Sequence, residues 1–425
     1  MKNTDEYIGK APLYRAVLCL SKRDKVRFHM PGHTGHGKRS GLLAGAPFDL
    51  TELEGLDDLH APRGAIAQAE ELLAQACGCR RAYMFTTGST GCMHAALAFA
   101  RTRGDILYTG KMHKSFFGGL QLLGLSAEYV PEEQLEERLK RGAGSLFFTS
   151  PDYFGNTLGG EEKAALCKKY GVASVADSAH GAHFPFSSLL PRSLTGVADL
   201  CFVSMHKTME VYTGGAVLCA NGEAADECAV YRGLVHTTSP SYLVMASMDR
   251  ARAVWQERGE SYYRAINAAV KKLLLPPGCE RVPSDDLSRL VIKCPGDAQA
   301  ALEGLNGQGI YCEAAFENKL ILILTKFNYT RLDYLCAALA QISCPPLKRS
   351  EGFCLQMADV RGKKTAFCRV EECQGRIAGA DMGLYPPGVP QIRRGEIIDK
   401  KAAKFVAENQ ARLFGLAYGR VVVLE

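Results

Sequence analysis

Short apolar runs alternate with helix-forming stretches from Ala82 to Gly215, and this alternation constrains the fold more than any other feature of the chain. The runs "AYMFTT", "GDILYTG" and "GSLFFTS" are each followed by a loop or a helix-like stretch, and "GVASVAD", "ADLCFVS" and "GGAVLCA" come next. Strands of this length separated by helices indicate βαβ units, in which helices cover both faces of a mainly parallel sheet. We therefore predict an α/β fold with such a sheet in its large domain.

The character of the sequence changes towards the carboxyl end. Apolar residues recur at helical spacing between Leu243 and Val270, which predicts one long helix that the prolines at 276–277 end. Farther along, "SRLVIKC" and "KLILILT" have the composition of strands. Because 425 residues are too many for one typical core, we predict a second, smaller α/β domain. The predicted parts are an N-terminal segment over 1–75, a large domain over 76–274 and a small domain over 275–425.

Charge and composition argue against two classes of partner. The formal charge of +6 is small for this length, and no run of Lys or Arg is dense enough to predict a nucleic-acid partner. No apolar stretch is long enough to predict a membrane span, and the amino terminus lacks the apolar core of a signal peptide. The 16 cysteines include no C-x-x-C pair and are interpreted as reduced residues, which predicts a cytoplasmic protein.

Polar residues directly follow three of the predicted strands. Gly88, Ser89 and Thr90 stand between "AYMFTT" and a helix, Asp177 ends "GVASVAD", and Lys207 follows "ADLCFVS". Ligands of parallel sheets collect at the carboxyl ends of the strands, so we expect these groups at one edge. Taken alone, the serine and threonine are as suited to cap a helix as to bind a phosphate. Taken alone, the aspartate fits a helix cap or an internal ion pair.

Taken together, the three groups match the needs of pyridoxal 5′-phosphate (PLP). Its phosphate needs backbone N–H groups and hydroxyls, its ring nitrogen needs a carboxylate, and its aldehyde needs a lysine that forms a Schiff base. A lysine at the end of an apolar strand is explained if Lys207 is held covalently in this way. Ser204 and His206 would lie beside it and contact the phosphate.

Two groups of histidines raise the question of a metal site. His180 and His183 lie three positions apart, and His29, His33 and His36 lie in "FHMPGHTGH". Neither group has the carboxylates or cysteines that are typical of a zinc site, so we predict no bound metal.

The chain resembles the Orn/Lys/Arg decarboxylase family in eight ordered segments. These are "RFHMPGHTGHG", "DLTELEGLDDLHAPRGAIAQAEELLAQACG", "GSTG", "HKS", "DSAHGAHF", "SMHKT", "TTSPSYLVMASMD" and "LYPPGVPQIRRGE". The resemblance covers nearly the whole chain and implies a short form of the family, without an amino-terminal regulatory domain. It implies the aspartate-aminotransferase-like fold (PLP fold type I) with a seven-stranded sheet, PLP as the cofactor, and a segment 1–75 that contributes to a dimer and its active site.

The resemblance also implies roles for individual residues. Lys207 would be the Schiff-base lysine and would form the catalytic set with His206 and Asp177, whose carboxylate would pair with the pyridine nitrogen. His113 would stack on the cofactor ring. Ser239 would reach the phosphate of a neighbouring subunit, so a homodimer or a higher even oligomer is expected. The residues implied to bind the cofactor are Gly88, Ser89, Thr90, His113, Asp177, His180, Ser204, His206, Lys207 and Ser239.

The implied activity is PLP-dependent decarboxylation of arginine, lysine or ornithine to the amine and CO₂. Departures from the family pattern at Thr87, Asp152, Ser178 and 209–214 fall on the substrate side. A diverged PLP-dependent aminotransferase or lyase for another amino acid therefore stays open as an alternative. A basic substrate needs a carboxylate for its distal cation. The candidates are Asp49, Glu52, Glu54, Asp57, Asp58, Asp152 and Glu210.

Overall fold

The computed structural model describes residues 6–23, 42–347, 353, 355–360, 362–386 and 388–425. By the density of contacts, the chain forms two compact units. The first unit combines Met1–Gly110 with Ala127–Cys344, and the second combines Lys111–Ser126 with Pro345–Glu425.

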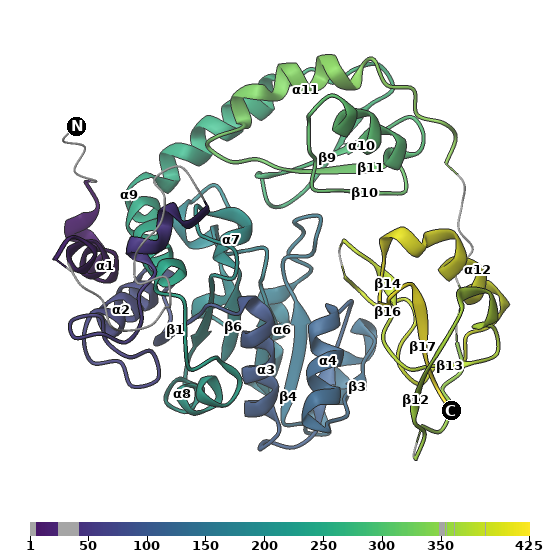
Figure 1. The fold of residues 1–425 in the computed structure, drawn as a ribbon, viewed down its shortest axis with the longest axis horizontal. Helices are drawn as coiled ribbons and strands as arrows, with labels where there is room; N and C mark the ends of the chain where they lie inside the picture. Colours follow the sequence, from purple (N-terminus) through teal and green to yellow (C-terminus); the bar gives the residue numbers. More distant parts are fainter. Residues whose placement is uncertain (1–5, 24–41, 348–352, 354, 361, 387) are drawn as a thin grey trace. The chain divides into compact units, whose positions relative to one another are not determined.

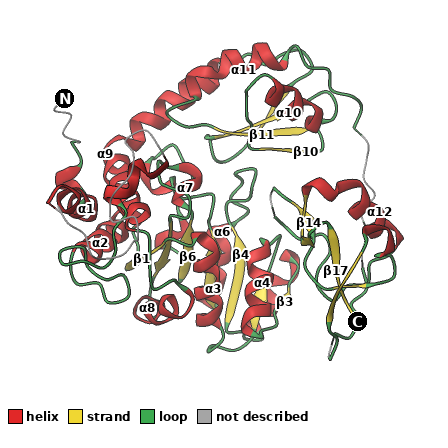
Figure 2. Ribbon diagram, viewed as in Figure 1, coloured by secondary structure: helices red, strands yellow, loops and turns green. Residues whose placement is uncertain are grey.

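A seven-stranded sheet lies at the centre of the first unit, in the order β1-β7-β6-β5-β4-β2-β3 (Figure 1 and Figure 2). Strand β7 runs antiparallel to both of its neighbours, and the other pairs are parallel. This confirms the predicted α/β fold with a mainly parallel sheet. The strands are β1 (Arg81–Phe85), β2 (Ile106–Tyr108), β3 (Glu128–Tyr129), β4 (Ser145–Thr149), β5 (Ala173–Asp177), β6 (Leu200–Val203) and β7 (Ala216–Ala220).

The central strands are continuous apolar runs because both of their faces are covered. Every residue of β6 and β7 is buried, as expected for strands packed between helices. The α-helices of this part are α1 (Pro12–Arg23), α2 (Ala65–Cys77), α3 (Gly88–Ala100), α5 (Leu135–Lys140), α6 (Gly160–Lys169), α7 (Met205–Thr208), α8 (Ala224–Val235) and α9 (Tyr242–Lys272). Short 3-10 helices cover Ile8–Lys10, Leu42–Phe48, Glu132–Gln134, Phe184–Phe186, Leu194–Gly196 and Tyr329–Arg331.

A buried ion pair ties β1 to the helices beside it. Nη1 of Arg232 in α8 donates to Oε1 of Glu70 in α2, and the same oxygen accepts the N–H of Met84 in β1 at 2.8 Å. Burial raises the pKa of Glu70, and the guanidinium opposes this by stabilising the carboxylate. The pair therefore anchors the strand whose carboxyl end leads into α3.

The predicted long helix is confirmed as α9, which begins after the N-cap Ser241 and ends at Lys272, before the two prolines. The runs "SRLVIKC" and "KLILILT" contain two strands of a four-stranded antiparallel sheet in the order β10-β11-β9-β8. Its elements are β8 (Glu280–Val282), β9 (Arg289–Lys293), α10 (Ala298–Gly307), β10 (Ala314–Phe316), β11 (Lys319–Ile323) and α11 (Leu332–Leu339). Buried residues of this sheet join the same apolar core as the large sheet.

The second unit has an apolar core of its own, built around Met382, Ile392, Val421 and Val423. Its elements are α4 (Lys114–Leu123), β12 (Thr365–Cys368), β13 (Ile377–Ala378), β14 (Gly383–Leu384), α12 (Lys400–Asn409), β15 (Leu413–Phe414), β16 (Leu416–Ala417) and β17 (Arg420–Leu424), with 3-10 helices at Val370–Glu372 and Gln410–Arg412. The predicted boundary at residue 275 follows the end of α9, but residues 275–425 divide between the two units. The reason is that residues up to Cys344 share the first core and later ones form the second.

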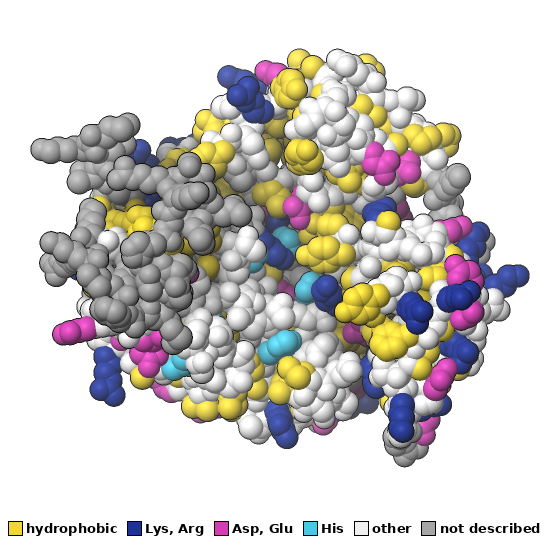
Figure 3. Space-filling model, viewed as in Figure 1, with side chains coloured by type: hydrophobic (Ala, Val, Ile, Leu, Met, Phe, Trp, Pro, Cys, Tyr) yellow, Lys and Arg dark blue, Asp and Glu magenta, His cyan; other side chains and the backbone are white. Residues whose placement is uncertain are grey.

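Positive and negative side chains are interspersed on the face of the molecule drawn in Figure 3. Among the described residues, none of the helices combines the length and the apolar character that a membrane crossing needs.

Candidate active site

Two parallel strands and one antiparallel strand bring the predicted groups to one edge of the sheet. The carboxyl ends of β1 and β6 lead into α3 and α7, and the antiparallel β7 begins at the same edge. The N–H of Gly88 donates to the carbonyl of Gly214 at 2.8 Å, and the N–H of His206 donates to the carbonyl of Gly215 at 3.3 Å. The main chain before β7 therefore contacts both the start of α3 and the segment that carries Lys207.

The helix α3 begins at Gly88, as the predicted phosphate-binding segment requires. No side chain caps this helix at Thr87. The first N–H groups of a helix have no acceptor within it, and they lie at the positive end of the helix dipole. Ser89 and Thr90 stand in this first turn, which makes it suited to an anion.

Asp177 ends β5 in a buried position, with 6% of its surface exposed. Its Oδ1 accepts the N–H of Ala179 at 3.1 Å. Burial raises the pKa of the Asp177 carboxyl, while the positive charge of Lys207 and this hydrogen bond lower it. A buried carboxylate is stabilised by a partner that is positively charged or donates a hydrogen bond to it.

Lys207 lies in α7, and its Nζ is 3.0 Å from Nε2 of His180. Burial lowers the pKa of the Lys207 amine. The carboxylates of Asp177 and Glu313 oppose this effect, and the guanidinium of Arg289 adds to it. Burial outweighs the two carboxylates, so Lys207 loses its proton more readily than an ordinary lysine and reaches the unprotonated form that reacts as a nucleophile.

Ser204 and His206 lie on either side of the start of α7. Ser204 is fully buried, and its hydroxyl has no hydrogen-bond partner in the part of the chain that the structure describes. Nδ1 of His206 lies 3.1 Å from the carbonyl of Gly215, so this nitrogen carries a proton and donates it. Burial lowers the pKa of His206, which favours the neutral ring.

Three further side chains from outside the predicted set are linked to His180, which contacts Lys207. Nη2 of Arg289 in β9 lies 2.7 Å from Nδ1 of His180. The ring of Tyr153 meets the His180 ring edge to face, with centroids 5.1 Å apart, and its hydroxyl donates to Oε1 of Glu313. The sequence offered one signal for them, which was a charged residue, Arg289, at the start of the apolar run "SRLVIKC".

Other predicted site residues do not join this cluster in the described contacts. His113 belongs to the second unit, where it caps α4 and accepts the N–H of Ser115 at 3.2 Å. Ser239 is exposed, and its N–H donates to Oγ1 of Thr237 at 3.1 Å. Two contacts therefore stay predictions: that of His113 with the cofactor ring, and that of Ser239 with the phosphate of a neighbouring subunit.

The histidines that raised the question of a metal site have other surroundings. His183 is fully buried, and its Nε2 lies 3.1 Å from Oδ2 of Asp286, whose pKa is lowered by this histidine against the effect of burial. The three histidines at positions 29, 33 and 36 lie outside the described residues. Within the described ranges, no group of three or more His, Cys, Asp and Glu side chains could hold a metal ion.

Several of the candidate carboxylates for a substrate cation have structural partners instead. Asp57 accepts the N–H groups of Arg63, Gly64, Ile66 and Ala67 and so caps the start of α2. Asp152 accepts the N–H groups of Phe154 and Asn156 within its own loop. Glu210 pairs with Lys326 and accepts the indole N–H of Trp255 at 2.8 Å. These three carboxylates therefore have structural roles within the chain.

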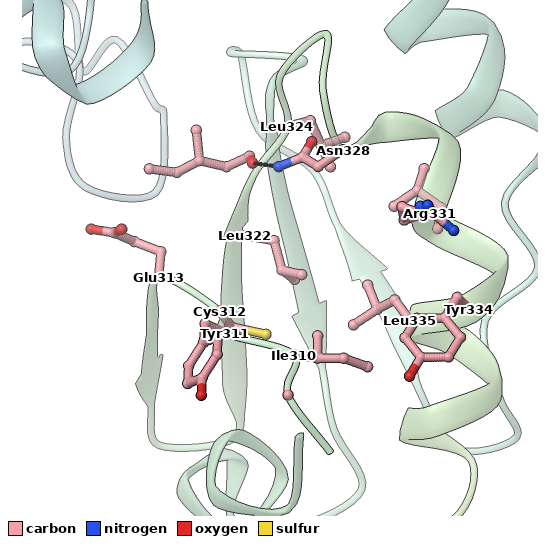
Figure 4. Close-up of a pocket in the computed structure, with 13 residues that line it drawn as sticks. Ile310, Tyr311, Cys312, Glu313, Leu322, Leu324, Asn328, Arg331, Tyr334 and Leu335 are labelled. Carbon is pink, nitrogen blue, oxygen red and sulfur yellow. Dashed lines mark hydrogen bonds between the residues drawn. The ribbon is translucent and has the colours of Figure 1, made fainter. Parts of the chain in front are cut away.

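A separate pocket of about 340 Å³ lies between β11, α11 and the loop before β10 (Figure 4). Its interior is formed by apolar side chains, among them Ile310, Leu322 and Leu335. Figure 4 shows the carboxylate of Glu313 pointing away from these side chains. The pocket therefore shares Glu313 with the cluster around Lys207, but the Glu313 carboxylate does not face its apolar side chains.

Comparison with known sequences identifies the family. The profile of the Orn/Lys/Arg decarboxylase major domain matches residues 11–135 and 116–274, which is more than half of the chain. The chain belongs to the Orn/Lys/Arg decarboxylase family. This confirms the resemblance inferred from the eight ordered segments and identifies the protein as an amino-acid decarboxylase.

Bacterial proteins match nearly the whole chain. It is 28% identical to the uncharacterized protein YaaO of Bacillus subtilis (strain 168), over 92% of this chain and 93% of that protein. It is 26% identical to an arginine decarboxylase of Bacillus anthracis, over 94% and 93% of the two chains. The structure of the constitutive lysine decarboxylase of E. coli matches 99% of this chain and 83% of that one, with a TM-score of 0.74 and 18% identity. Together with a serine palmitoyltransferase from Sphingomonas wittichii (TM-score 0.51, 18% identity, 65% and 75% of the chains), it confirms PLP fold type I.

Proposed function

We propose that this decarboxylase uses PLP, bound at the cluster of Lys207 and Asp177, to remove the carboxyl group of a basic amino acid. The observation that carries the proposal is a half-buried amine and a buried carboxylate at the carboxyl edge of one sheet, each influencing the pKa of the other. The arginine decarboxylases among the family members support the basic substrate.

The buried groups fit this cofactor in charge and in hydrogen bonding. The unpartnered hydroxyl of Ser204 and the first turn of α3 offer donors for a phosphate. A protonated ring nitrogen would give the Asp177 carboxylate the charged partner that its burial calls for. Lys207 would hold the cofactor covalently through its unprotonated Nζ.

Bound PLP supplies an electron sink for the electron pair that remains on Cα when CO₂ leaves. Asp177 keeps a proton on the ring nitrogen, because its carboxylate stabilises the charged form. Lys207 would hold a proton on Nζ and donate it to Cα in place of the lost carboxyl group. His206 is less suited to that step, because its Nδ1–H is engaged by Gly215 and its lowered pKa leaves Nε2 unprotonated.

Product analysis with a panel of amino acids tests the proposed reaction. With arginine, lysine or ornithine, we expect CO₂ and the corresponding amine in equal amounts. The panel also contains neutral and acidic amino acids, and a matched reaction without added PLP serves as the control. Turnover of only neutral or acidic amino acids, or a keto acid as the product, would show that the proposal is wrong.

We further propose that Glu313, with the hydroxyl of Tyr153, binds the distal cation of the substrate. The carboxylate of Glu313 is exposed, yet it is close enough to Lys207 to raise the pKa of the amine. Its Oε1 accepts the Tyr153 hydroxyl and the Tyr153 ring contacts His180, so Tyr153 links Glu313 to the histidine beside Lys207. An anion at that position suits the charged end of a long basic side chain.

Replacing Glu313 with Gln should raise KM for the basic substrate by about 10- to 100-fold, as expected for the loss of a charged hydrogen bond. The kcat should change little, because the distal cation is bound equally in the ground state and the transition state. Steady-state kinetics measures both constants. Glu317→Gln is a matched control, because Glu317 is an exposed carboxylate on the same hairpin. Equal KM values for wild type and Glu313→Gln would contradict this role.

The lowered pKa of Lys207 predicts how the protein without cofactor takes up PLP. The unprotonated Nζ bonds to the aldehyde carbon, and the aldehyde oxygen leaves as water with two protons. Since the amine loses its proton at a lower pH than an ordinary lysine, the uptake rate should reach its plateau at a lower pH than for free Nα-acetyl-lysine. Stopped-flow absorbance across pH 6 to 10 measures both profiles, and coinciding midpoints would contradict the prediction.

A further inference from the structure

The contacts of His180 fix where its ring carries a proton. A guanidinium has only donors, so Nδ1 of His180 must accept the hydrogen bond from Arg289 at 2.7 Å. The proton of the neutral ring is then on Nε2, the nitrogen that lies 3.0 Å from Nζ of Lys207. A ring with this tautomer donates to the lysine and cannot accept from it.

This tautomer leaves one consistent state for the lysine. An ammonium group has donors and no acceptor, whereas an unprotonated amine has a lone pair that accepts the Nε2–H. The hydrogen-bond chain from Arg289 through His180 to Lys207 is therefore complete only when Nζ is unprotonated.

Arg289 is itself held in place by a buried network. It is 3% exposed, and its Nε lies 3.9 Å from Oδ2 of Asp286. Asp286 in turn contacts Nε2 of His183 and accepts the N–H of Ser288 at 2.8 Å. Among the described residues, Nε and Nη1 of Arg289 have no hydrogen-bond partner, so the hydrogen bond of this guanidinium is the one that Nη2 makes to His180.

We infer that Arg289 is a positioning residue that keeps Lys207 in its nucleophilic, unprotonated form by fixing the tautomer of His180. The inference rests on the proposed role of Lys207 and extends it to a residue of the four-stranded sheet. The charged groups that face the lysine are Asp177 from β5, Glu313 from the loop before β10, and Arg289 from β9, with His180 and His206 as titratable neighbours. The two carboxylates favour the ammonium form, and the arginine with its histidine opposes them.

Nitrogen NMR of the wild-type protein without cofactor tests the tautomer directly. With ¹⁵N-labelled histidine at pH 7.5, the His180 ring should show a protonated Nε2 and an unprotonated Nδ1. The His180→Asn variant assigns the signals by their absence. A proton on Nδ1, or on both nitrogens, would overturn the inference whatever happens to any variant of Arg289.

The effect on the lysine is measured by the pH profile of PLP uptake. In Arg289→Gln the midpoint should move to higher pH, with uptake at pH 7 slower by about tenfold for each pH unit of the shift. Arg289→Lys retains one donor and should restore most of the wild-type midpoint. Arg281→Gln removes an exposed arginine of the same sheet and should leave the midpoint unchanged. Circular dichroism checks that each variant is folded.

The outcomes separate this inference from the proposed function. If Arg289→Gln is folded and its midpoint equals that of the wild type, the positioning role is wrong, although PLP still attaches to Lys207. If PLP attaches elsewhere in the wild type, the proposed function fails first. If Arg289→Gln does not fold, the wild-type NMR spectrum and the Arg289→Lys variant decide. The inference would also be contradicted if His180 carried its proton on Nε2 in the wild type but the uptake midpoint of Arg289→Lys lay well above that of the wild type.

Discussion

Arginine in place of Lys207 is expected to abolish the covalent attachment of PLP and to lower kcat by about 10³-fold, within the range for loss of a proton-transfer group. The guanidinium is also a basic group, but it does not lose its proton in proteins and so has no nucleophilic nitrogen. Borohydride reduction makes the attachment permanent, and peptide mapping then identifies the labelled residue. In the wild type, the label should lie on Lys207.

Lys163→Arg is the matched control for this result. Lys163 is also buried in the first unit, where its Nζ lies 3.0 Å from Oε1 of Glu132 in an ion pair. This variant should retain the label and near-normal turnover, because its lysine is occupied by a structural partner. A label that persists in Lys207→Arg would contradict the assignment of the attachment site.

Asparagine in place of Asp177 should lower kcat by about 10²- to 10³-fold, as for the removal of one preorganised electrostatic partner. The amide is neutral, so it does not hold a proton on the ring nitrogen of the cofactor. Attachment of PLP to Lys207 should persist, since the lysine itself is unchanged. Steady-state kinetics and the absorbance of the bound cofactor measure the two properties separately.

A second aspartate of the same sheet controls for effects on folding. Oδ2 of Asp199 accepts the N–H and the hydroxyl of Ser174 at 2.8 and 2.7 Å, at the opposite end of β5 from Asp177. Asp199→Asn should therefore affect stability more than turnover. If Asp177→Asn turned over substrate at a near-normal rate, the carboxylate would have no part in the electron sink.

The parts of the fold that follow from local pattern were predictable from the sequence. Continuous apolar runs predicted the central strands, and the strand-end rule alone placed Asp177 and Lys207 at one edge of the sheet. Strand β3 was missed, because its two residues, Glu128 and Tyr129, are both exposed and form no apolar run. The division of residues 275–425 was also missed, because it depends on which core each segment joins.

The side chains around the lysine were less predictable, because they come from distant parts of the chain. Arg289 reaches His180 across 109 positions, and Glu313 reaches Tyr153 across 160. No spacing rule joins residues that meet only through the packing of two sheets. For Asp57 the sequence pattern misled in the other direction. Its place in an acidic motif made it a candidate for binding the substrate cation, but in the structure its carboxylate caps α2.

The backbone before β7 has a consequence for how this site can change over time. Gly214 and Gly215 each contact one half of the site through main-chain atoms, and Gly214 has φ of 102°, where a Cβ would lie 2.6 Å from the carbonyl oxygen of Thr86. The span from the start of α3 to the segment of Lys207 is thus set by peptide groups, which are the same in every sequence. Mutation can therefore exchange the side chains that face a substrate while that span is inherited unaltered.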